Sequence, residues 1–210
     1  MADYAVSLDR YCLVTVGATV GFPELTDTAL QPELWAYLSS QGFTELRIQC
    51  GPDLPQVTTN LDARKHEIPS GLSVSVFDVR KNLMEEEMTL CKPMAGKRRR
   101  GLVISHAGTG TILDAWKLSL PLIVVPNTKL LDDHQTELAK HLAAEGYATN
   151  SSTRLNDLQG AIHKSEILWE DNTHRWPPNK VSSNDSDRLR LWDIGVEEVA
   201  KEEKSSMALD

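Results

Sequence analysis

With 210 residues, of which 40% are hydrophobic and 25% charged, the chain has the length and composition of a single globular domain. Its net charge of −8 argues against a general nucleic-acid-binding protein, because such proteins normally carry an excess of basic residues. Three scattered cysteines without a CxxC pair, an acidic N-terminus and no apolar run near ~18 residues argue against a zinc site, a disulfide framework, a signal peptide and a membrane span.

The first half of the chain contains three apolar runs that predict strands. They lie at residues 11–16, 45–50 and 72–77. Between the first two runs, apolar positions at helical spacing predict a helix over residues 23–41, interrupted near Pro32 and stopped by Gly42. A strand–helix–strand order therefore begins the chain.

The segments around the third run are less regular. Residues 53–70 are polar and show no clear period, so we expect a loop there. Residues 80–94 are compatible with a helix, although their glutamates and the basic run at 97–100 predict an exposed surface.

The second half alternates strands and helices more clearly. Strands are predicted at 101–105 and 121–125, and helices at 110–119, 132–145 and 155–169. Such alternation is typical of an α/β domain with a mostly parallel, Rossmann-like sheet. Residues 171–186 are rich in Asn, Ser, Pro and Asp and are predicted to be a linker, and residues 187–210 to hold an amphipathic helix.

Two strand-to-helix junctions are rich in glycine and have the composition of phosphate-binding loops. They are Gly17-Ala18-Thr19 and His106-Ala107-Gly108-Thr109-Gly110-Thr111. Glycines let the backbone approach a phosphate, and a helix N-terminus offers N–H donors with a positive partial charge. Tight turns alone are the alternative explanation. Neither junction has the lysine of a Walker loop, and Leu113 stands where a GxGxxG fingerprint needs its third glycine.

Asp114 falls one turn into the helix that follows the second junction. A carboxylate there can accept the ribose hydroxyls of a nucleotide whose phosphates lie at the helix end, or it can simply complement the helix dipole. Further on, Asp132-Asp133-His134-Gln135 opens the next predicted helix. Its acid and amide groups suit sugar hydroxyls, with a plain N-cap by Asp132 or Asp133 as the alternative.

These residues together carry a resemblance to a known family. The run SHAGTGTILDAWKLSLPLIVVPNTKLLDDHQTELAKHL, with VTVGAT at 14–19 and VFDV at 76–79, resembles the nucleotide-sugar half of a GT-B glycosyltransferase. More narrowly, it is similar to the small catalytic subunits of the eukaryotic UDP-N-acetylglucosamine transferase that makes dolichol-diphosphate chitobiose. Bacterial enzymes that add GlcNAc to a lipid-linked muramyl sugar share the architecture.

The resemblance implies a role for each matching position. Gly17, Ala18 and Thr19 would face the diphosphate, as would His106, Gly108, Thr109, Gly110 and Thr111; Phe77 and the backbone of Asp78 would meet the uracil; Asp114 would bind the ribose; and His134 and Gln135 would face the GlcNAc hydroxyls. His106 is also the expected catalytic group, since a donor at the diphosphate stabilises the charge of the departing UDP. Residues 1–170 would then be the nucleotide-sugar-binding domain.

Length implies that the enzyme needs a second chain. A complete GT-B enzyme has two α/β domains, about twice the 100–200 residues of one, so the acceptor site and the general base would come from a partner. The resemblance implies a membrane-anchored partner at the cytosolic face of the endoplasmic reticulum, with residues 187–210 as the docking helix and lipid-diphosphate-linked GlcNAc as acceptor. No cofactor or metal is expected, since no carboxylate pair has metal-binding spacing. The alternatives are a UDP-sugar-binding regulator without turnover and an oxidoreductase with an aberrant Rossmann loop.

Overall fold

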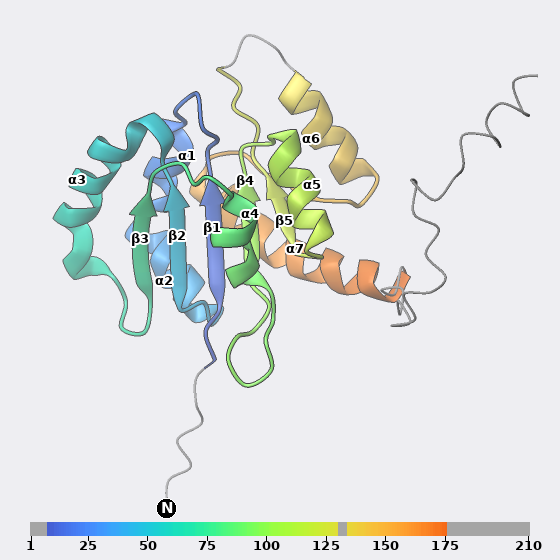
Figure 1. Cartoon of the computed structure of the whole chain (residues 1–210), viewed down its shortest axis with the longest axis horizontal. Helices are drawn as coiled ribbons and strands as arrows, with labels where there is room; N and C mark the ends of the chain where they lie inside the picture. The colour runs from blue at the N-terminus through green and yellow to red at the C-terminus, as the bar shows by residue number, and fades with distance from the viewer. Residues whose placement is uncertain (1–7, 130–133, 176–210) are drawn as a thin grey trace, which may run out of the picture. The chain divides into compact units, whose positions relative to one another are not determined.

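A six-stranded sheet forms the centre of the computed structural model, which describes residues 8–129 and 134–175 (Figure 1). Its strands are β1 (Tyr11–Thr15), β2 (Glu45–Gln49), β3 (Ser73–Phe77), β4 (Leu102–Ser105), β5 (Leu122–Val124) and β6 (Thr149–Asn150). They lie in the order β3-β2-β1-β4-β5-β6, and every neighbouring pair is parallel. The α/β class with a parallel sheet is confirmed, and this strand order is that of a doubly wound Rossmann-like fold.

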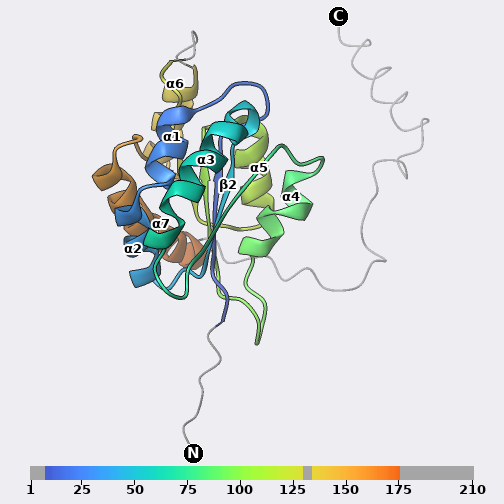
Figure 2. The same ribbon diagram turned by 90° about the vertical axis from the view of Figure 1, so that its left-hand side faces the viewer.

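Helices cover both faces of the sheet (Figure 2). One face carries α1 (Pro23–Ala29), α2 (Pro32–Ser40), α3 (Leu54–Arg64) and α7 (Leu155–Arg175), and the other carries α4 (Leu83–Glu86), α5 (Thr109–Lys117) and α6 (His134–Ala144). Pro32 separates α1 from α2 as predicted, because proline has no N–H for the interior of a helix but fits its first turn.

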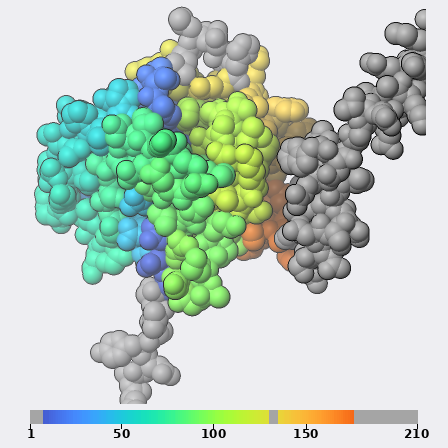
Figure 3. Space-filling model, in the orientation of Figure 1, coloured from blue at the N-terminus to red at the C-terminus, as the bar shows by residue number. Residues whose placement is uncertain are grey.

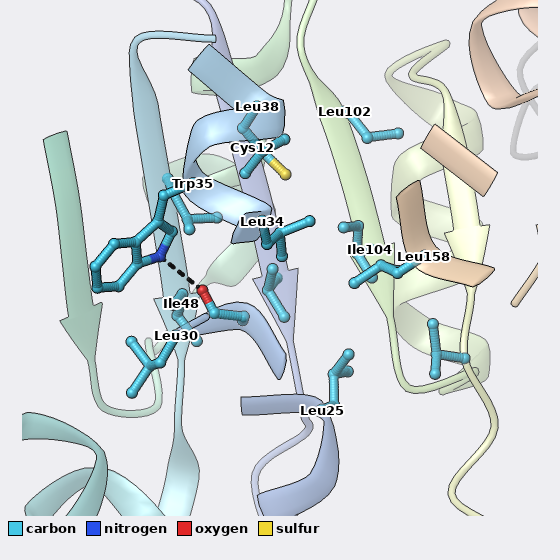
Figure 4. Close-up of a cluster of buried hydrophobic side chains, with 14 of the residues drawn as sticks. Cys12, Leu25, Leu30, Leu34, Trp35, Leu38, Ile48, Leu102, Ile104 and Leu158 are labelled. Atoms are coloured by element: carbon cyan, nitrogen blue, oxygen red, sulfur yellow. Dashed lines mark hydrogen bonds between the residues drawn. The ribbon is translucent and has the colours of Figure 1, made fainter. Parts of the chain in front are cut away.

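The larger core lies between the sheet and the helices α1, α2, α3 and α7, and Figure 4 shows part of it. Leu34 and Leu38 of α2 are fully buried with Cys12 of β1 and Ile48 of β2. The indole N–H of Trp35 is buried as well and donates to the carbonyl oxygen of Ala29 at 2.9 Å. All three cysteines of the chain are buried free thiols.

The prediction of a loop at residues 53–70 is wrong, because helix α3 occupies Leu54–Arg64. Val57 and Leu61 lie one turn apart and are buried against the sheet, while most of the remaining side chains face solvent. With the partly buried Leu54, these few apolar residues are enough to dock the helix, since the sheet supplies the other side of the contact. So few apolar positions leave a periodicity too weak to read from the chain alone.

The predicted helix over residues 80–94 is also wrong in its extent. The segment forms α4 (Leu83–Glu86) and a 3-10 turn, Met88–Cys91, with Glu87 between them. Glu87 turns inward to pair with two arginines, which breaks the helical run.

Helix α7 continues six residues beyond its predicted end at 169, through the first five residues of the predicted linker. Its last turns are anchored, since Asn172 Nδ2 donates to the carbonyl of Gly146 at 2.7 Å. The rest of the linker and the predicted helix at 187–210 lie outside the described residues. Within the two described ranges, none of the helices combines the length and the apolarity that crossing a bilayer requires.

Candidate functional site

The carboxyl ends of β1 and β4 mark the point where the strand order reverses. Strands to one side of this point lead to β2 and β3, and strands to the other side to β5 and β6. In open α/β sheets a ligand-binding crevice forms at such a switch point, outside the carboxyl ends of the strands. Both glycine-rich junctions predicted as phosphate loops follow these two strands, so the sheet brings them together (Figure 1).

The imidazole of His106 packs between the two loops. A Cβ atom on Gly17 would lie 2.9 Å from His106 Nε2, and one on Gly108 only 2.5 Å from it. Gly17 also has φ +89°, which favours glycine. Ala107, between His106 and Gly108 in the sequence, has a φ of +68°, a strained value of the kind found at functional sites. The glycines are therefore required by the ring of His106 as well as by the turns.

Burial sets the electrostatics of His106. Desolvation lowers the pKa of His106, and the nearby Thr15 carbonyl offsets this only in part. Its Nδ1 makes no hydrogen bond of regular geometry among the described residues. An anion placed beside the ring would raise this pKa, because an opposite charge favours the protonated imidazole.

The start of α5 is open to an anion. Gly108 is its N-cap residue and no side chain caps the first turn. Thr109 and Gly110 are exposed and Thr111 is half-buried, and nothing lies within 4 Å of a Cβ placed on Gly110. The free N–H groups and the positive end of the helix dipole therefore lie at the same edge of the sheet as Gly17, with Ala18 and Thr19 exposed on the other loop.

Asp114 lies one turn further along α5 and is 31% exposed. Its carboxylate accepts from Lys117 Nζ at 3.1 Å, an ion pair at the surface of one helix. Such pairs contribute little free energy, so the carboxylate is available to a ligand.

Gln135 is the second residue of α6, and a hydrogen bond orients its side chain. Its Oε1 accepts the backbone N–H of Asn127 at 3.2 Å, so its amide NH₂ is left to donate. Asn127 also borders a cavity of about 340 Å³, whose other walls are Phe22, Glu24 and the loops that follow β5 and β6. Nothing is described of the His134 side chain, and Asp132 and Asp133 lie outside the described residues.

The ring of Phe77 is covered rather than open. It is 7% exposed, with the guanidinium carbons of Arg47 and Arg80 lying 5.5 and 4.9 Å from its centroid. A base at this edge would therefore meet the exposed residue Asp78 and not the face of the ring.

Sequence reasoning missed a further polar group at the same edge. Asp53 follows β2, and its carboxylate lies so close to Gly21 that a Cβ there would be 2.2 Å from Oδ2. Side-chain oxygens on the last residues of β1, β2 and β4 are buried and have no hydrogen-bond partner among the described residues: Thr15 Oγ1, Gln49 Oε1 and Ser105 Oγ. The same holds for Asp53 Oδ2, which follows β2. Buried polar atoms are normally satisfied, so these four point to a bound ligand or water. The Gly51-Pro52-Asp53 junction after a predicted strand was the available signal.

Within the described ranges, no three His, Cys, Asp or Glu side chains gather in a way that would hold a metal ion.

Comparison with known sequences places these residues in a family. Residues 11–167 match the glycosyltransferase family 28 C-terminal domain. The chain is 37% identical over 130 residues to UDP-N-acetylglucosamine transferase subunit ALG13 of Yarrowia lipolytica, covering 62% of this chain and 59% of that protein. It is 33% identical over 185 residues to the subunit of the same name from Cryptococcus neoformans, covering 80% and 89%. The match thus spans less than two thirds of the Yarrowia protein.

Solved structures show the same fold. An NMR solution structure of ALG13 aligns with a TM-score of 0.57 at 29% identity, covering 76% of this chain and 87% of that one. MurG of Acinetobacter baumannii aligns with a TM-score of 0.52 at 21% identity, covering 81% of this chain and 44% of that one. The second likeness concerns the fold alone. Together with the match to the glycosyltransferase family 28 C-terminal domain, it confirms the predicted equivalence to one half of a GT-B glycosyltransferase.

Proposed function

The chain belongs to the glycosyltransferase family 28 C-terminal domain family and, within it, to the UDP-N-acetylglucosamine transferase subunits, and on that premise we propose a specific reaction for it. It transfers GlcNAc from UDP-GlcNAc to dolichol-diphosphate-linked GlcNAc, the second step in assembling the lipid-linked oligosaccharide for N-glycosylation. It acts as the donor-binding subunit of a two-chain enzyme.

One observation carries the donor assignment. His106 is wedged between two glycine loops beside the uncapped start of α5, and Asp114 lies one turn further along that helix. Along α5, the hydrogen-bond donors suited to a diphosphate come first and the carboxylate suited to the ribose hydroxyls comes next. The diphosphate and the ribose are linked in the same order in UDP. Gln135 and His134 at the start of α6 are the proposed contacts for the GlcNAc.

The proposed mechanism is direct displacement at the anomeric carbon. The acceptor hydroxyl forms the new glycosidic bond while the bond to UDP breaks and the diphosphate takes up negative charge. His106 and the N–H groups of α5 stabilise that charge, and donors aimed where charge develops act mainly on turnover. The general base comes from the partner.

We propose that the partner is a membrane-anchored chain that brings the acceptor domain and holds this subunit at the cytosolic face of the endoplasmic reticulum. The name "subunit" of the relatives supports a partner. Residues 187–210 carry Leu189, Trp192, Val196 and Val199 at helical spacing, which suits docking in an apolar groove of that chain.

A transfer assay tests the function. GlcNAc transfer to a diphosphate lipid is measured with the full chain, with and without the co-expressed membrane partner, and with a chain that ends at Ser186. Transfer only by the full chain with its partner is expected. Saturable UDP binding without transfer in any combination would instead favour the non-catalytic regulator.

Asp114→Ala is expected to weaken UDP binding about ten- to a hundredfold, because a lost hydrogen bond to a charged group costs about 1.5–3 kcal/mol. Calorimetry with UDP measures it. Lys117→Ala is the matched control, since it removes the ion-pair partner of Asp114 but keeps the carboxylate, and UDP binding should persist. An unchanged dissociation constant in a folded Asp114→Ala chain would rule out the ribose contact.

Gln135→Ala is expected to weaken UDP-GlcNAc binding about tenfold and to leave UDP binding unchanged, because the lost amide faces only the sugar. Titrating both ligands into the variant and into Glu137→Ala, an exposed site on the same helix, gives the comparison. Equal losses for the two ligands would mean that Gln135 only supports the helix.

A further inference from the structure

A buried carboxylate lies between two arginines next to the proposed base-binding edge. Glu87 is 2% exposed, and its carboxylate accepts hydrogen bonds from Arg47 Nε at 2.5 Å and from Arg47 Nη2 at 2.9 Å. Arg80 Nε donates to its Oε1 at 2.9 Å. The three residues come from β2, from the loop after β3 and from the junction of α4 with the following 3-10 turn. One side chain therefore ties three segments together.

Phe77 forms the second half of this cluster. Its ring lies under both guanidinium groups and packs in the same core cluster as Met88, the residue that follows Glu87. Cations above an aromatic face are attracted by its quadrupole, so the arginines hold the ring while Glu87 holds the arginines. The green segment that includes α4 lies at the front of the molecule in Figure 3.

The backbone just beyond Phe77 has few other restraints. The carbonyl of Phe77 accepts from Cys50 N at 3.0 Å, which is where β3 still follows β2. Asp78 and Val79 are exposed, and the Val79 N–H donates to the carboxylate of Asp78 itself at 2.6 Å. The next residue along the chain, Arg80, is held to the rest of the fold by its hydrogen bond to Glu87.

The charge on Glu87 persists at neutral pH. Burial raises the pKa of Glu87, but the hydrogen bonds and charges of Arg47 and Arg80 outweigh burial and leave it below its usual value. A charged, buried group with two cationic partners has one favourable position, because displacing it leaves an uncompensated charge.

We propose that Glu87 is a positioning residue for the nucleobase: through Arg80 and Phe77 it sets the place of the Asp78–Val79 backbone that receives the pyrimidine ring. This rests on the proposed function for the identity of the ligand. Glu87 would thus support base recognition without touching the ligand. The sequence alone predicted no functional role for its segment.

NMR titrations, which measure millimolar affinities, test the proposal with two probes. UDP carries the base, whereas inorganic pyrophosphate reports only on the loops at Gly17 and Gly108. In Glu87→Gln the dissociation constant for UDP is expected to rise at least about tenfold, while that for pyrophosphate stays within about twofold. Glu85→Gln, which makes the same charge change at an exposed site of the same segment, should bind both probes as the unmodified chain does.

Equal weakening of both probes by Glu87→Gln would show a merely structural role and overturn the proposal, as would unchanged UDP binding. If Glu87→Gln fails to fold, Arg80→Lys replaces it, since Arg80 is 37% exposed and the change keeps its charge while removing the Nε donor. It too should weaken UDP and spare pyrophosphate. An unmodified chain that binds pyrophosphate but not UDP would refute the proposed function itself, and the base-positioning role with it.

Discussion

His106→Ala is expected to slow GlcNAc transfer by the assembled enzyme about 100- to 1,000-fold, the usual effect of removing one donor to a developing charge. UDP-GlcNAc binding should weaken much less, because the diphosphate carries more charge in the transition state than in the ground state. Single-turnover measurements with saturating donor separate the two effects. His106→Gln, which keeps a neutral N–H donor in the same place, should recover part of the rate.

The pH dependence of UDP binding independently tests whether His106 contacts the diphosphate. Burial lowers the pKa of His106 in the free protein, and the diphosphate raises it in the complex. Binding therefore takes up a proton between these two pKa values, and UDP affinity should fall as the pH rises through that window. In His106→Ala, UDP affinity should not change with pH across the same window. An unchanged turnover rate in folded His106→Ala would show that His106 has no catalytic role.

Arg10→Met is expected to lower the free energy of unfolding by about 3 kcal/mol, the loss typical when one partner of a buried ion pair is removed. Arg10 is 5% exposed, and its guanidinium donates to the carbonyls of Gln41 at 2.6 Å and Arg100 at 3.0 Å. It also pairs with Glu166 of α7 and lies 4.1 Å from the centroid of Phe43. Methionine fills part of the volume but leaves these acceptors without their donor.

Urea denaturation at neutral pH measures this loss, and Arg154→Met is the matched control. Arg154 precedes α7 and makes an exposed ion pair with Asp157 of its first turn, so its replacement should leave the midpoint unchanged. Because Arg10 precedes β1 and the candidate site lies at the other end of that strand, the folded fraction of Arg10→Met should bind UDP normally. Equal midpoints for the two variants would mean that the buried guanidinium contributes nothing net.

The sequence by itself determined the fold class and located the two glycine-rich loops that we propose to hold the diphosphate. The apolar runs of β1 and β4 are continuous, each is followed by glycines and then by a helix, and this order specifies a parallel sheet with ligand loops at its carboxyl edge. These signals are local: burial on both faces makes a strand uniformly apolar, and a tight turn demands glycine at a definite place.

Only the tertiary structure decided which distant side chains share an environment. Helix α3 is held by only a few apolar residues. Arg10 pairs with Glu166, which lies 156 positions away in the sequence, and Glu87 pairs with Arg47, which lies 40 positions away. The ring of His106 explains both Gly17 and Gly108 only once β1 and β4 are neighbours. Periodicity reports which face of an element is apolar, but not what covers that face. The partner of a buried charge or a packed ring is set by the order of strands in the sheet, which no local pattern encodes.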